Sequence, residues 1–261
     1  MYAIYYVFCV IIIILLVTTY VLLFNKPFRT KAFVINLEKN NQRLERFNKF
    51  YQASDLVQNM PVTRYNAVNG RELDIQSYMT PFAYKELLHA EKVKYRTMHY
   101  QTTRGGVGCY LSHTNLFKML LEDPNADFYI IFEDDAIMMP KIYNKLKAAV
   151  LNAPKDWDMI VFAPITQVVS DEIGKYRVFD YFWGLSCYAI RKEGARKFVE
   201  EFNRKAISMQ IDSKMSAMVL NGKFKVYGYK DKIVWHGRAE TDIQLPLRRQ
   251  PGVNPFELYD A

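Results

Sequence analysis

Residues 128–139 read FYIIFEDDAIMM, and this stretch decides the fold. Its apolar part, residues 128–132, predicts a fully buried β-strand, and Glu133, Asp134 and Asp135 follow it directly. In an α/β sheet, ligands bind at the carboxyl ends of strands, which is where these acids fall. Neighbouring carboxylates repel one another and resist leaving water unless a positive partner lies among them.

A divalent cation is the simplest partner for these three acids. Carboxylate oxygens suit Mg²⁺ or Mn²⁺, and such ions join acidic side chains to the phosphates of a nucleotide. The plain alternative is that Asp134 or Asp135 only caps a following turn or helix, since Asp is a preferred capping residue. Three acids behind one buried strand favour the cation.

Length and composition indicate one large α/β domain with a substantial core. The chain has 261 residues, of which 50% are hydrophobic and 15% aromatic. Its net charge of +8 fits an anionic ligand or a membrane surface. The basic residues are dispersed and no recognition motif is present, which argues against nucleic-acid binding. The cysteines, Cys9, Cys109 and Cys187, form neither a metal-type pair nor a disulfide framework.

The N-terminal run over residues 2–24, YAIYYVFCVIIIILLVTTYVLLF, carries no charge. As a helix at about 1.5 Å per residue it would span a bilayer core of roughly 30 Å. No clear small-x-small cleavage site follows, so the run predicts a retained single-pass membrane anchor. We expect a linker at residues 25–30, one folded domain at residues 31–244 and a basic, Pro-rich tail at residues 245–261.

Hydrophobic periodicity predicts alternating strands and helices along the domain. Besides residues 128–132, strands are expected at residues 31–37, 62–68, 156–162, 181–190 and 224–229, and helices at residues 42–53, 81–93, 112–122, 140–151, 191–202 and 210–220. Residues 71–104 are the least patterned part. Such an excursion is typical of a lid or an acceptor-binding region, and equally of a family-specific insertion.

Several polar residues lie where strands or helices begin or end. Asn36 is near the carboxyl end of the first strand, and Arg43 and Arg46 lie three residues apart on the next helix. Such arginine pairs are usually solvated surface, but the position just beyond a strand also suits a phosphate contact. Asp212, in the first turn of its helix, is either a cap or a functional acid. His236 follows a later apolar patch.

Three glycines, Gly105, Gly106 and Gly108, open the helix that carries Ser112 and His113. A glycine-rich entry to a helix can offer backbone N–H groups to an anion, although neither a G-x-G-x-x-G fingerprint nor a P-loop is present. His113 is either structural or a substrate contact.

Taken in order, these pieces resemble the family 25 glycosyltransferases, a group that includes lipooligosaccharide sugar transferases and collagen hydroxylysine galactosyltransferases. The similarity runs over residues 31–244. It is carried by AFVINLEKNNQRLERF, RYNAVNGREL, GGVGCYLSHTNLFKML with IIFEDDA, and DWDMIVF with WGLSCYAIRKEGARKFVE. The Ser-His and Glu-Asp-Asp blocks at this spacing are the specific ones.

The resemblance implies a GT-A-like single-domain α/β sandwich that binds a nucleotide sugar at the ends of its central strands. It also implies an inverting, metal-dependent hexosyltransferase using Mn²⁺ or Mg²⁺, with a UDP-sugar as donor. Glu133 and Asp135 would be the acids of a D-x-D-type motif, and His236 a further metal ligand by fold analogy. Asp212 in QIDSKMS would be the catalytic base. The donor-binding residues would be Asn36, Arg43, Arg46, Gly106, Ser112, His113 and Asp134.

The acceptor would be a glycan, a lipid-linked glycan or a protein. Lys26, Arg29 and Lys31 after the apolar run favour a cytosolic domain, whereas a secretory-pathway glycan enzyme needs the opposite orientation, so the side of the membrane stays open. One competing interpretation is a nucleotidyl or phosphoryl transferase, which would normally show further carboxylates for a second metal. The other is a membrane-tethered carbohydrate-binding protein that has kept the fold without turnover.

Overall fold

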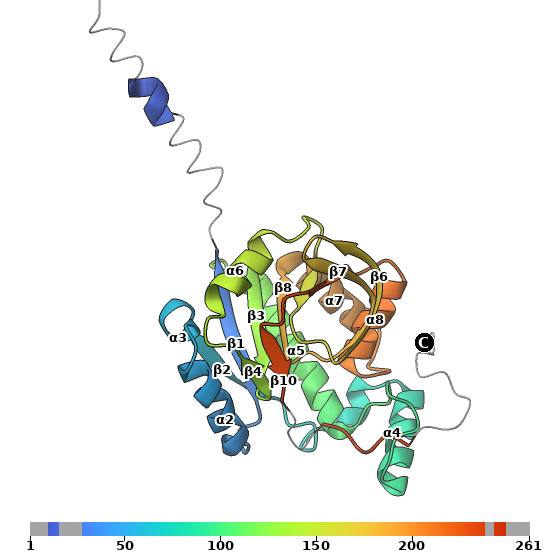
Figure 1. The fold of residues 1–261 in the computed structure, drawn as a ribbon. Coiled ribbons are helices and arrows are strands. Elements are labelled where there is room, and N and C mark those ends of the chain that lie inside the picture. Colours follow the sequence, from blue (N-terminus) through green and yellow to red (C-terminus); the bar gives the residue numbers. More distant parts are fainter. Residues whose placement is uncertain (1–9, 16–27, 238–242, 249–261) are drawn as a thin grey trace, which may run out of the picture.

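The structure is a computed structural model that describes residues 10–15, 28–237 and 243–248. A mixed β-sheet carries helices on both of its faces (Figure 1). The strands are β1 (Thr30–Asn36), β2 (Val62–Asn66), β3 (Phe128–Glu133), β4 (Ala136–Met138), β5 (Met159–Val161), β6 (Thr166–Ile173), β7 (Tyr176–Trp183), β8 (Cys187–Arg191), β9 (Val226–Tyr229) and β10 (Val234–His236). The helices are α2 (Asn41–Gln52), α3 (Leu56–Asn59), η1 (Ile75–Tyr78), α4 (Pro81–Val93), α5 (Arg104–Glu122), α6 (Tyr143–Leu151), α7 (Lys192–Arg204) and α8 (Ile211–Leu220).

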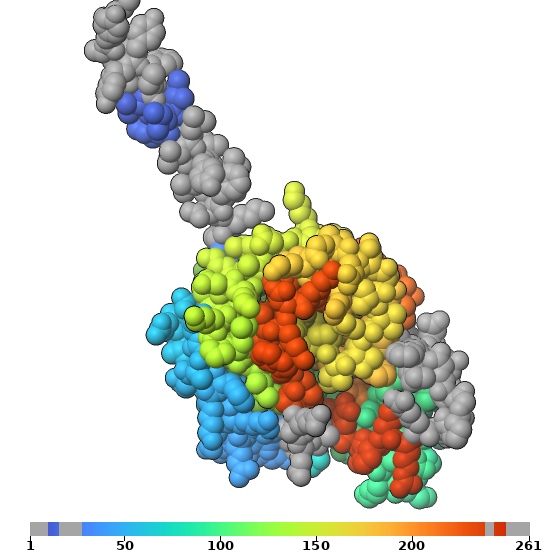
Figure 2. All heavy atoms as spheres, viewed as in Figure 1, coloured from blue at the N-terminus to red at the C-terminus, as the bar shows by residue number. Residues whose placement is uncertain are grey.

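The main sheet has eight strands in the order β2-β1-β3-β8-β5-β9-β7-β6. Strand β1 is parallel to both β2 and β3, and the register pairs Ile35 with Glu133. The carboxyl ends of β1 and β3 therefore lie side by side at one end of the strands, where Asn36 and the three acids come together. A second, two-stranded sheet pairs β4 with β10, and the chain around β10, red in Figure 2, lies on the surface between the green and yellow segments.

The period-two alternation of β3 builds two cores, one on each face of the sheet. Tyr129 and Ile131 pack into the core covered by α5, α7 and α8. Phe128, Ile130 and Phe132 pack into the core covered by α2 and α6. All five residues are buried, which confirms the predicted central strand. The sheet between two helical layers confirms the α/β class.

The predicted strand at residues 181–190 is in fact two strands, β7 and β8, that run in different places in the sheet. The chain breaks at Gly184, whose φ of +95° lies in the region that favours glycine. A Cβ there would lie only 2.7 Å from Ile165 Cγ1, so the site also lacks room for a side chain. The β6–β7 hairpin that precedes the break was not expected from the sequence.

The structure does not support the membrane anchor predicted at residues 2–24. Within the part of the chain that the structure describes, no helix combines the length and the apolar composition needed to cross a bilayer. The described part of the run is a short helix at residues 10–15, and residues 2–9 and 16–24 lie outside the described residues. The predicted single-pass localisation, which depended on that helix, is therefore not supported. Residues 25–27 of the predicted linker and residues 249–261 of the tail also lie outside the described residues.

Candidate functional site

A cavity of about 370 Å³ opens at the sheet edge where β1 and β3 end. Its walls include predicted site residues from six different segments: Asn36, Arg43, His113, Glu133, Asp134, Asp135, Asp212 and His236. Cys109, Gly184 and Gln244, which the sequence did not single out as site residues, also line it. The volume falls in the range of about 300–1,000 Å³ that is usual for small-molecule sites.

The middle acid, Asp134, is neutralised by its neighbours from β1 and α2. Its carboxylate accepts hydrogen bonds from Arg43 Nε at 2.7 Å and from Asn36 Nδ2 at 2.7 Å, and the Arg43 guanidinium makes a further contact with it. Burial lowers the pKa of Arg43, but the hydrogen bond and charge of Asp134 outweigh it, so the pKa is raised overall. Arg43 and Asn36 therefore lie in the cavity wall while held by Asp134. Arg46 is exposed and lies beside Gly237.

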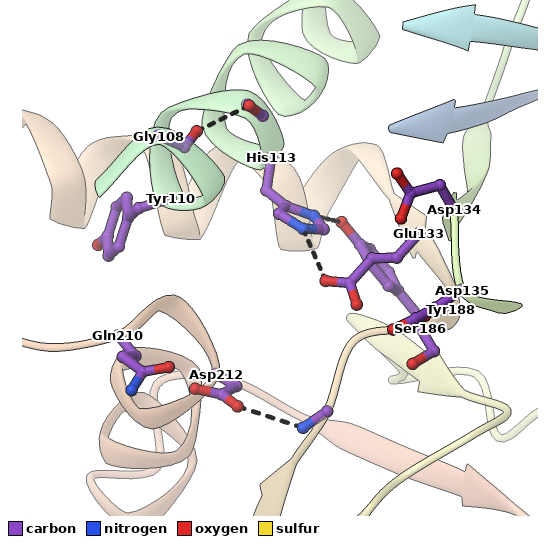
Figure 3. Close-up of polar contacts among 12 residues, drawn as sticks. Gly108, Tyr110, His113, Glu133, Asp134, Asp135, Ser186, Tyr188, Gln210 and Asp212 are labelled. Atoms are coloured by element: carbon purple, nitrogen blue, oxygen red, sulfur yellow. Dashed lines mark hydrogen bonds and ion pairs between the residues drawn. The ribbon is translucent and has the colours of Figure 1, made fainter. Parts of the chain in front are cut away.

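The first acid, Glu133, points toward α5 rather than toward Asp134 (Figure 3). Its Oε1 lies 3.4 Å from His113 Nε2, and His113 Nδ1 lies 2.6 Å from the Tyr188 hydroxyl. Burial lowers the pKa of His113 to about 3, so the imidazole is neutral. Burial, followed by the charges of Asp134 and Asp212, raises the pKa of Glu133 to about 7.

The third acid, Asp135, faces His236 because β4 and β10 pair Ala136 with His236. Asp135 Oδ2 lies 3.5 Å from His236 Nδ1, which is also 2.7 Å from Ser186 Oγ. Asp135 Oδ1 is buried and has no hydrogen-bond partner among the residues that the structure describes. Burial and the charge of Glu133 raise the pKa of Asp135. An unpartnered carboxylate oxygen of this kind suits a cation ligand.

Asp212 lies in the first turn of α8, but the N-cap residue of that helix is Gln210. Its carboxylate accepts the backbone N–H of Ser213 at 2.8 Å. It also accepts that of Gly184 at 3.2 Å, the contact dashed at Asp212 in Figure 3. Burial raises the pKa of Asp212 above its usual range. The side chain is thus held at the cavity wall by two contacts, one to the first turn of its own helix at Ser213 and one to the strand break at Gly184.

Gly106 and Ser112 lie behind the cavity wall, where Gly106 lies against Thr102 just before α5 and Ser112 joins α5 to the loop after β2. The N–H of Gly106 donates to Thr103 Oγ1 at 3.0 Å, as in an ordinary helix N-terminus. Ser112 is fully buried, donates to the Gly108 carbonyl at 2.7 Å and accepts the Val68 N–H at 2.8 Å. Both residues therefore support the site from outside the cavity lining.

Among the described residues, one group of three metal-ligand side chains brings its ligand atoms within 4.8 Å of one another: Cys109, His113 and Glu133. The predicted set of Glu133, Asp135 and His236 is brought together only in part, since Glu133 points to His113. Cys109 was missed because its partners were sought among the other cysteines. The available signal was its spacing of four residues from His113, which places both on one helix face.

In the metal-free protein, the raised pKa of Glu133 predicts a pH-dependent stability. Between its usual value near 4.5 and about 7, the folded protein keeps a proton on Glu133 that the unfolded chain has lost. The free energy of unfolding should therefore fall as pH rises through this window and level off above it, by on the order of 3 kcal/mol. Urea unfolding of wild type and Glu133→Gln at several pH values across this window measures the effect. If the free energy of unfolding fell equally steeply with pH in both proteins, the raised pKa would not belong to Glu133.

Known proteins resemble the chain over most of this region. Procollagen galactosyltransferase 1-A from Xenopus laevis is 30% identical over 185 residues, which cover 65% of this chain and 28% of that protein. A glycosyltransferase 25 family member from Anopheles gambiae is 29% identical over 179 residues, with the same coverage of 65% and 28%. The match therefore spans little more than a quarter of the length of these curated relatives.

Among solved structures, a mutant Drosophila β1,4-galactosyltransferase 7 in complex with manganese, UDP-Gal and xylobiose aligns with a TM-score of 0.40 and 8% identity, over 80% of this chain and 70% of that chain. The family model described as glycosyltransferase family 25 (LPS biosynthesis protein) matches residues 29–215, well over half of the chain. On that match, the chain belongs to glycosyltransferase family 25.

Proposed function

We propose that this protein transfers a hexose, galactose or glucose, from a UDP-sugar to a hydroxyl group with inversion at the anomeric carbon. The acceptor would be a glycan, a lipid-linked glycan or a protein. The observation that carries the proposal is that Glu133, Asp135 and Asp212 line one cavity while Arg43 neutralises the acid between the first two. Membership of the family supports sugar transfer, and the names of the galactosyltransferase relatives support galactose first.

A divalent cation fits the acidic edge of this cavity. Asp135 offers a buried oxygen without a hydrogen-bond partner in the described part of the chain, and His236 lies beside it. Carboxylate oxygens with one imidazole suit Mn²⁺, and Mg²⁺ as a second choice. Glu133, Asp135 and His236 would hold the ion. When bound, it supplies positive charge that offsets the charge developing on the diphosphate leaving group.

Asp212 would take the proton of the acceptor hydroxyl. As the acceptor oxygen bonds to the anomeric carbon, the bond from that carbon to the diphosphate breaks and the hydroxyl proton passes to the Asp212 carboxylate. Burial raises the pKa of Asp212, which makes it a stronger base than an exposed aspartate. The N–H groups of Gly184 and Ser213 keep the carboxylate in place for this step.

The remaining wall residues would bind and orient the donor. Asn36 and Arg43 lie at the end of β1 and the start of α2, and both hold Asp134 rigid, so the donor would meet a preorganised polar wall. His113 would contribute to donor binding indirectly: its Nε2 lies 3.4 Å from Glu133 Oε1 and would orient that carboxylate.

Donor hydrolysis tests the proposal. The protein is incubated with a panel of UDP-sugars and Mn²⁺, released UDP is measured, and the mass of any glycosylated acceptor is then determined. We expect UDP release from UDP-galactose or UDP-glucose that stops when EDTA is added. Donor binding without UDP release, with every sugar and acceptor tried, would instead favour a carbohydrate-binding protein that has kept the fold without turnover.

A further inference from the structure

We propose that Cys109, His113 and Glu133 form a second, thiol-containing cation site in the cavity floor that binds Zn²⁺. Their ligand atoms lie within 4.8 Å of one another, and all three residues line the cavity. The site shares Glu133 with the proposed manganese site, but its sulfur and imidazole ligands select a different class of metal.

The fold brings the three side chains together from two elements. Cys109 and His113 are one turn apart on α5, so their side chains project from the same face of the helix. Glu133 is the last residue of β3, which packs beneath that helix. Both elements have buried neighbours on either side, so the ligands lie on rigid supports rather than on loops.

The distances fit tetrahedral zinc coordination. A nitrogen and an oxygen bound to zinc at about 2.0–2.2 Å are separated by roughly 3.3–3.6 Å at a tetrahedral angle. His113 Nε2 and Glu133 Oε1 are 3.4 Å apart. Sulfur at about 2.3 Å from zinc would lie roughly 3.6 Å from either atom, so a thiol at the 4.8 Å limit has to come about 1.2 Å closer to each of them.

His113 is oriented as a zinc ligand requires. The residue has no exposed surface, and its Nε2 has no hydrogen-bond partner among the described residues. Its other nitrogen, Nδ1, lies 2.6 Å from the Tyr188 hydroxyl. With the proton on Nδ1, donated to the Tyr188 oxygen, Nε2 carries the lone pair on the side of Glu133, 3.4 Å away, and Tyr188 acts as the outer partner that metal-bound histidines usually have.

Zinc fits this group better than manganese because one ligand is sulfur. Cys109 is a free, half-buried thiol at the cavity wall, so it can lose its proton to solvent as the metal–sulfur bond forms. Three protein ligands leave a fourth position toward the cavity, as in zinc sites that also bind water. If the proposed function holds, zinc would compete with manganese for Glu133 and inhibit transfer.

Cobalt(II) titration of the metal-free, full-length protein tests the site without donor or acceptor. We expect one equivalent of Co²⁺ to produce a thiolate-to-cobalt charge-transfer band, and Zn²⁺ to abolish it. Cys109→Ala should remove the band and weaken Zn²⁺ binding on the order of 100-fold. Tyr188→Phe should keep the band and weaken binding roughly 10-fold, since it removes only the outer hydrogen bond.

The matched control leaves Cys109 as the only cysteine. The variant Cys9→Ala with Cys187→Ala keeps the proposed ligands and should keep the full band. A band that survives Cys109→Ala, or one lost in the control while the control remains folded by circular dichroism, would overturn the site. Because this readout needs no turnover, a failed transferase assay leaves the result standing, and a missing band leaves the proposed function standing.

Discussion

Asp135→Asn is expected to lower metal-dependent UDP release by about a thousand-fold or more and to leave the protein folded. The substitution removes a charged oxygen from the proposed cation site, and electrostatic stabilisation of a leaving group by a metal is worth several kcal/mol. Stability should stay level or rise, because the Asp135 carboxylate is buried near Glu133 and one of its oxygens has no hydrogen-bond partner in the described structure. UDP release and thermal unfolding are measured on the same preparation.

Asp171→Asn is the matched control for this prediction. Asp171 is an exposed acid on β6, far along the sheet from β3, and its loss should change neither activity nor melting temperature. Asp135→Asn with activity within about twofold of wild type would contradict the metal assignment. A fall in melting temperature that accompanies lost activity would instead assign Asp135 a structural role.

Asp212→Asn is expected to reduce kcat by on the order of 100-fold or more with little change in the donor KM. Asparagine keeps the size of the side chain and an oxygen that can accept the N–H of Gly184 or Ser213, so the local geometry is preserved. An amide, however, cannot take the acceptor proton. Initial-rate kinetics at saturating donor measure the effect.

Glu193→Gln separates catalysis from helix electrostatics. Glu193 lies in the first turn of α7, as Asp212 does in α8, but its side chain is 46% exposed and pairs with Arg196. If the acids act only on the helix dipole, both substitutions should cost a few tenths of a kcal/mol and leave kcat nearly unchanged. Equal, small effects of the two would therefore rule out Asp212 as the base.

Elements with strong local patterns could be predicted from the sequence. The apolar run before the acids is β3, and the helix expected at residues 81–93 is α4. The helix expected at residues 112–122, with Val107 or Cys109 as alternative starts, begins at Arg104, because Thr103 caps it by accepting the Gly106 N–H. The glycines concealed how early the helix starts, because glycine is a weak helix former. Gly108 is needed for packing, since a Cβ on it would lie 2.3 Å from the Val68 carbonyl oxygen in the loop after β2.

Long-range pairings could not be read from local patterns. His236 reaches Asp135 only because β10 pairs with β4, a strand of three residues nearly a hundred positions earlier in the chain. The β6–β7 hairpin was missed because much of β6 is exposed and shows no clean alternation of apolar and polar residues.

The sequence identified which residues line the candidate site better than it identified which of them contact one another. Of the predicted residues, most line the cavity, but their contacts depend on the fold: Arg43 holds Asp134, and Tyr188 holds His113. The spacing of residues in the sequence cannot predict contacts between residues this far apart along the chain. Cys109 is the exception, because its helical spacing to His113 was visible in the sequence and pointed to a shared face.

The most direct test of the central claim, that this cavity binds a nucleotide diphosphate together with a divalent cation, is calorimetric titration of UDP into the protein with and without Mn²⁺. We expect UDP to bind at least about 10-fold more tightly with Mn²⁺, a gain of roughly 1.4 kcal/mol, and the gain to vanish in Asp135→Asn. The same affinity with and without Mn²⁺, or no binding in either case, would contradict the claim.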